Sequence, residues 1–149
     1  MKFRTAGLIV TLALGILLAP LPTDAQQAAK VVRIGFLNPS TPSATSHFLE
    51  AFRQGLRELG YVEGKNIILE RRYAEGRVER LPDLAAELVR LKVDVIVVAG
   101  GDGVIRQAMN ATKTIPIVLT GFGSDPVKAG FIESLARPGG NVTGITNPA

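Results

Sequence analysis

The chain has 149 residues, contains no cysteine and carries a formal net charge of +4. The lack of cysteine excludes disulfides, cysteine-based zinc sites and thiol catalysis. Its lysines and arginines are spread among acidic residues and form no basic block, so we predict no nucleic-acid partner.

The first 25 residues have the pattern of a secretory signal peptide. Lys2 and Arg4 give a basic start, and an uncharged apolar run follows from Ala6 to Ala19. Small residues at Thr23 and Ala25 predict cleavage after Ala25. The alternative is a membrane anchor, but the run is shorter than the roughly 20 residues that a spanning helix needs. We therefore predict a periplasmic protein whose folded part begins after residue 25.

Two strand–helix units are predicted in the first half of the folded part. Lys30 to Leu37 is an apolar strand, and the loop Asn38 to Ser43 follows it. Thr45 to Leu59 is predicted to be a helix, and Asn66 to Tyr73 is a second strand whose charged end favours a place near the sheet edge. A second helix starts near Leu81, where a following proline fits the first turn. The apolar face of the first helix is predicted to contain Phe48, Phe52, Leu56 and Leu59.

The second half of the folded part contains the segment that says most about the fold. Val93 to Ala99 is a nearly continuous apolar run, typical of a strand buried on both faces of a parallel sheet. A Gly-Gly-Asp-Gly turn at Gly100 to Gly103 leads into a third helix. Ile115 to Leu119 is a fourth strand, and the glycine-rich loop Gly121 to Asp125 follows it. A fourth helix with Val127, Phe131, Ile132 and Leu135 on its apolar face and a fifth strand at Asn141 to Thr146 complete the predicted elements.

This alternation predicts the fold class. Strands joined by helical connections favour a doubly wound α/β fold with a parallel sheet and helices on both faces. Ligands of such sheets bind at the carboxyl ends of the strands. The loops Asn38 to Ser43, Gly100 to Gly103 and Gly121 to Asp125 are expected to meet at that edge.

Two nucleotide-binding motifs are absent, and a third is present only as a fragment. The turn after the first strand lacks G-x-G-x-x-G, and no G-x-x-x-x-G-K-[ST] occurs. The Gly-Gly-Asp-Gly turn resembles the nucleotide loop of the NAD kinase and diacylglycerol kinase group, but Val104 stands where those kinases usually carry threonine. The alternative is that Asp102 caps the third helix.

No catalytic or metal-binding constellation is predicted. His47 is the single histidine, and no G-x-S-x-G sequence accompanies it. Metal binding by His47 lacks any second soft ligand, because the chain has no other histidine and no cysteine. We therefore predict a protein that is not an enzyme and uses no cofactor or metal.

Four segments carry a family resemblance. They are Gly55 to Ile67, Arg80 to Val97, Thr114 to Val118 and Ser124 to Thr146, the last reading SDPVKAGFIESLARPGGNVTGIT. In this order they closely resemble a family of bacterial ABC-transporter substrate-binding proteins, the group that includes tryptophan-type and related amino-acid binding proteins. The resemblance covers nearly all of Val31 to Thr146.

The resemblance implies a type I periplasmic binding-protein fold, in which two α/β lobes joined by a hinge enclose a small solute. Because family members are considerably longer, it also implies that residues 26–149 form the N-terminal lobe and that the chain stops near the hinge. A membrane permease is the implied partner, and the complete protein is expected to be a monomer. The alternatives are a ligand-sensing lobe of a signalling system and a kinase of the glycine-loop type.

The loops that match the family imply a ligand-binding set. It consists of Asn38, Ser40, Gly101, Asp102, Gly121, Ser124 and Asp125. Many relatives carry a threonine or a small residue where this chain has Gly101 and Asp102. An acidic side chain there would favour a ligand amine over a carboxylate, unless Asp102 caps its own helix.

Overall fold

The computed structural model describes residues 30–121 and 124–145. The predicted signal peptide, two residues of the loop Gly121 to Asp125 and the last residue of the predicted fifth strand lie outside these ranges. Over the described ranges, no helix combines the length and the apolar character that crossing a membrane requires.

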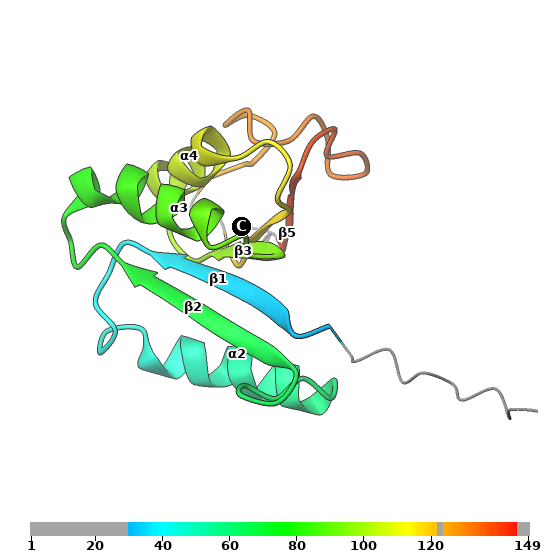
Figure 1. Ribbon diagram of the computed structural model, residues 1–149. Coiled ribbons are helices and arrows are strands. Elements are labelled where there is room, and N and C mark those ends of the chain that lie inside the picture. Colours follow the sequence, from blue (N-terminus) through cyan, green and yellow to red (C-terminus); the bar gives the residue numbers. More distant parts are fainter. Residues whose placement is uncertain (1–29, 122–123, 146–149) are drawn as a thin grey trace, which may run out of the picture. The chain divides into compact units, whose positions relative to one another are not determined.

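A five-stranded parallel sheet forms the centre of the fold, in the order β2-β1-β3-β4-β5 (Figure 1). The strands are β1 (Val32–Asn38), β2 (Ile67–Tyr73), β3 (Val95–Val98), β4 (Ile117–Leu119) and β5 (Val142–Gly144). The α/β fold class is thereby confirmed. As its charged end predicted, β2 lies at an edge of the sheet, and β3 lies at the centre.

Helices cover both faces of the sheet. One face carries α2 (Ser46–Glu58), whereas the opposite face carries α3 (Leu81–Arg90) and α4 (Asp102–Ala111) (Figure 1). A short 3₁₀ helix, η1 (Val78–Arg80), leads directly into α3. These three α-helices agree with the predicted helices to within a few residues.

The side chains of β3 divide between two hydrophobic cores, because successive residues of a strand point to opposite faces. Ile96 and Val98 are fully buried under α3 and α4, together with Leu88 and Ile105. Val97 points to the other face, where it joins the core that packs against α2. The apolar run Val93 to Ala99 therefore contains, as predicted, a strand that is buried on both faces of the sheet.

The predicted fourth helix is wrong. Residues 124–140 form turns and bends instead. One helical turn does start, since Ala129 N–H donates to Asp125 O at 2.9 Å, but Gly130 then adopts a left-handed conformation with φ of 75°. Phe131 is buried as its spacing suggested, whereas Leu135 is 67% exposed. The apolar periodicity was real over only one turn, and the glycine interrupts it.

The first glycine of the Gly-Gly-Asp-Gly turn is required by both its backbone and its surroundings. Gly100 has φ of 153°, which side-chain-bearing residues rarely adopt. A Cβ atom on Gly100 would also lie 2.7 Å from Val104 Cγ1 and 2.8 Å from Pro39 Cδ. Gly101 has φ of −82°, and a Cβ there would meet nothing within 4 Å.

Replacement of these two glycines by alanine should have very different effects on stability. Gly100→Ala should lower the free energy of unfolding by about 1–3 kcal/mol, because it combines backbone strain with a steric clash. Gly101→Ala should change it by less than about 0.5 kcal/mol, since the loss of a good N-cap residue offsets the reduced entropy of the unfolded chain. Urea denaturation followed by circular dichroism measures the free energy of unfolding of both variants. Equal effects would contradict the different roles assigned to Gly100 and Gly101.

Candidate functional site

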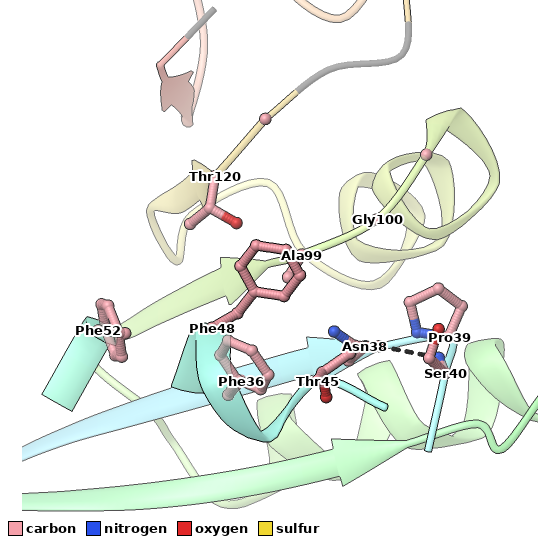
Figure 2. A pocket seen from close by; sticks show the side chains of 12 residues that line it. Phe36, Asn38, Pro39, Ser40, Thr45, Phe48, Phe52, Ala99, Gly100 and Thr120 are labelled. Carbon is pink, nitrogen blue, oxygen red and sulfur yellow. Dashed lines mark hydrogen bonds between the residues drawn. The ribbon is translucent and has the colours of Figure 1, made fainter. Parts of the chain in front are cut away.

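A pocket of about 520 Å³ opens at the carboxyl ends of β1, β3 and β4, beside the first turns of α2 (Figure 2). The adjacent strands β1 and β3 are followed by helices on opposite faces of the sheet. Such a change of side is where sheets of this kind bind their ligands. The lining residues come from the carboxyl ends of the three strands, from the loops after them and from α2. They are Phe36, Asn38, Pro39, Ser40, Thr45, Phe48, Phe52, Ala99, Gly100, Gly101, Thr120 and Gly121.

The pocket brings together four residues of the predicted set: Asn38, Ser40, Gly101 and Gly121. Asp102 instead lines a neighbouring groove between the N-terminal ends of α3 and α4. Neither Ser124 nor Asp125 lies among the described residues that line the pocket.

The side chain of Asp102 makes a contact that was not predicted. Capping of the helix was one of the two roles considered for Asp102, but the N-cap residue of α4 is Gly101 and no side-chain hydrogen bond caps this helix. The two carboxylate oxygens of Asp102 instead accept from Ser124 Oγ at 2.8 and 2.9 Å. Asp125 has a local role, because its Oδ1 accepts from Val127 N–H at 2.9 Å. The contact between Ser124 and Asp102 ties the loop after β4 to the start of α4.

An aromatic wall was missed by the sequence analysis. It consists of Phe36 from β1 and of Phe48 and Phe52 from α2. Phe36 is 3% exposed and packs against Phe52 with ring centroids 6.3 Å apart. Phe48 is 63% exposed, so the helix face assigned to the core carries one ring that the core does not cover. Its place in the first helical turn after the β1 loop was the available signal.

The polar groups of the pocket are neutral. Asn38 and Thr45 are 4% and 8% exposed, and Thr120 lies at the end of β4. Among the lining residues that the structure describes, none is charged. A nucleotide phosphate would therefore meet no lysine or arginine there, which disfavours the kinase hypothesis. The pocket suits an apolar or aromatic body with polar groups that hydrogen bonds can satisfy.

His47 lies outside this pocket, although it follows the same loop. Its ring contacts the ring of Phe48, with centroids 3.9 Å apart, and it is exposed. Across residues 30–121 and 124–145, no group of three or more histidine, aspartate or glutamate side chains could hold a metal ion.

Comparisons with known proteins support a binding role for this fold. A family model described as ABC transporter substrate binding protein matches residues 38–149. A tyrosine-binding protein of Clostridioides difficile is 36% identical over 110 residues, which cover 74% of this chain and 30% of that relative. The chain thus spans less than a third of the length of this relative.

Solved structures, including two of substrate-binding or ligand-bound proteins, also match this chain. A conserved domain protein from Vibrio cholerae matches with a TM-score of 0.72 and 31% identity, over 79% of this chain and 39% of the other. A ligand-free, open substrate-binding protein with adhesive properties from Clostridium difficile matches with a TM-score of 0.72 and 30% identity, over 80% and 40%. An ABC domain from Streptococcus pneumoniae in complex with L-Trp matches with a TM-score of 0.69 and 25% identity, over 77% and 38%.

Truncation of the aromatic wall should separate the ring that supports the fold from the ring that is free to contact a ligand. Phe36→Ala should lower the free energy of unfolding by about 3–5 kcal/mol, because it empties a buried position. Phe48→Ala should lower it by less than about 0.5 kcal/mol, since the ring is mostly exposed. Chemical denaturation of both variants gives these values; a large loss for Phe48→Ala would show that its ring belongs to the core.

Proposed function

Because the chain belongs to the family of ABC transporter substrate-binding proteins, we propose that its α/β domain supplies one side of the binding cleft for an aromatic amino acid. The protein would capture this solute outside the cytoplasm and present it to a membrane permease. It would act by binding alone, without chemical change to the solute.

The observation that carries this proposal is the combination of an aromatic wall with a neutral polar edge in one pocket. Phe48 offers an exposed ring on which a flat side chain can stack, and stacked rings contribute about 0.5–1.5 kcal/mol beyond the area that they bury. Asn38 and Ser40 line the same pocket and add neutral polar groups to it. The absence of charged side chains among the described lining residues disfavours ligands with acidic or basic side chains.

Two relatives support this class of ligand. One is described as a tyrosine-binding protein, and the other was solved in complex with L-Trp. Both are longer than the present chain, so part of each protein lies outside the region compared. We extend the ligand class to this chain because its own pocket has the aromatic wall that a flat ring requires.

The cellular setting is part of the same proposal. Residues 1–25 would act as a cleaved signal peptide, residues 26–149 would form the solute-binding lobe, and the mature protein would function in the periplasm. A membrane permease as the partner and a monomeric state of the complete protein are part of this proposal. Mass spectrometry of the mature protein would test the cleavage, because it should begin at Gln26.

Binding should be selective for aromatic amino acids. Titration of the ¹⁵N-labelled chain with L-tyrosine or L-tryptophan should shift amide resonances around the pocket, whereas L-glutamate and L-lysine should not. Phe48→Ala should weaken tyrosine binding by about threefold to tenfold, the loss expected when one aromatic contact is removed.

Leu59→Ala is the matched control for this titration. It removes another exposed apolar side chain near the end of the same helix, but Leu59 does not line the pocket. Its affinity for tyrosine should equal that of the unmodified chain. Resonance shifts with all four amino acids alike, or with none, would refute the proposed ligand class.

A further inference from the structure

The orientation of the Asn38 amide is determined by its neighbour. Asn38 ends β1, and its Oδ1 accepts a hydrogen bond from Ser40 N–H at 2.8 Å (Figure 2). A backbone N–H can only donate, so the carbonyl oxygen of the side chain must face Ser40. The amide nitrogen, with its two N–H groups, therefore points away from Ser40.

That nitrogen lies on the pocket side. Asn38 is only 4% exposed and lines the pocket, and in Figure 2 its nitrogen lies on the side of the rings of Phe36 and Phe48. Within residues 30–121 and 124–145, Nδ2 makes no hydrogen bond, yet it is not sealed off from solvent. A largely buried donor of this kind reduces stability unless an acceptor is supplied, so a ligand oxygen at this position would be favoured.

The hydroxyls of Thr45 and Thr120 differ from the Asn38 amide, because they can accept hydrogen bonds from a ligand but cannot donate them. Thr45 Oγ1 donates to Thr41 O at 3.1 Å, and Thr120 Oγ1 donates to Val98 O at 3.2 Å. Both protons are already used, so these two oxygens can only accept from a ligand. The pocket is thus polarised, with donors at Asn38 and acceptors at Thr45 and Thr120.

We propose that Asn38 determines which end of the solute enters this pocket, by donating from Nδ2 to the ligand carboxylate. The ligand ammonium then meets the acceptor oxygens of Thr45 or Thr120, and the aromatic ring lies against Phe48. This inference rests on the proposed function and adds the residue that recognises the carboxylate. Amines that lack the carboxylate are therefore poor ligands.

Asn38→Asp tests this assignment with almost no change in shape. One carboxylate oxygen still accepts from Ser40 N–H, whereas the other replaces the N–H₂ donor with an acceptor. Titrations with L-tyrosine and with tyramine, which lacks the carboxylate, are followed by ¹⁵N NMR. The unmodified chain should bind tyrosine more than about tenfold tighter than tyramine, and Asn38→Asp should lose that preference.

Asn110→Asp is the control, because it makes the same charge change at an exposed position of α4 outside the pocket. It should keep the preference for tyrosine. In the unmodified chain, the Asn38 side-chain N–H₂ resonances should shift with tyrosine and stay in place with tyramine. This measurement does not depend on the folding of the Asn38→Asp variant.

The outcomes separate the two proposals. If tyrosine binds the unmodified chain and Asn38→Asp equally, or if the Asn38 side-chain resonances do not move, the role of Asn38 is overturned while the proposed function stands. If neither tyrosine nor any other aromatic amino acid binds the unmodified chain, both proposals fail.

Discussion

The candidate site depends on the divergence of the chain at two neighbouring strands. β1 and β3 are hydrogen-bonded side by side, yet the helix that follows β1 covers one face and the helix that follows β3 covers the other. The chain therefore leaves these two strands toward opposite faces of the sheet, and an opening forms at the centre of the sheet edge. A strand order that kept both helices on the same face would close this opening.

The loops that border the opening are held by short contacts rather than by regular structure. Gly100 packs so closely against Pro39 and Val104 that a side chain would not fit. Asn38 stabilises its own turn through Ser40 N–H, and the loop after β4 is joined to α4 through Ser124 and Asp102. Each loop thus uses a polar or glycine residue for structure, which explains why the edge is rich in glycine and small polar residues.

Much of this architecture is predictable from the sequence, because burial leaves a direct trace in residue type. The apolar run of β3 and the charged end of β2 indicated a central strand and an edge strand, and both assignments are confirmed. The predicted helix at Val127 to Leu135 failed because spacing alone does not reveal the left-handed backbone of Gly130. The aromatic wall was missed because a helical face does not show which of its residues extend beyond the sheet, as Phe48 does.

Because the pocket is neutral, a zwitterionic ligand would have to be held there by hydrogen bonds. A zwitterion that enters it loses water around two charged groups, and no charged side chain among the described lining residues compensates for that loss. Compensation must come from hydrogen bonds of the right polarity, and Asn38, Thr45 and Thr120 differ in polarity because each has already committed one atom to the fold. The hydrogen bonds that shape the loops therefore also determine which atoms remain for a ligand. A mutation of Asn38 that preserves the fold can therefore still reverse specificity. Oδ1 of its amide holds the shape of the loop, whereas Nδ2 sets the hydrogen-bond polarity that a ligand meets.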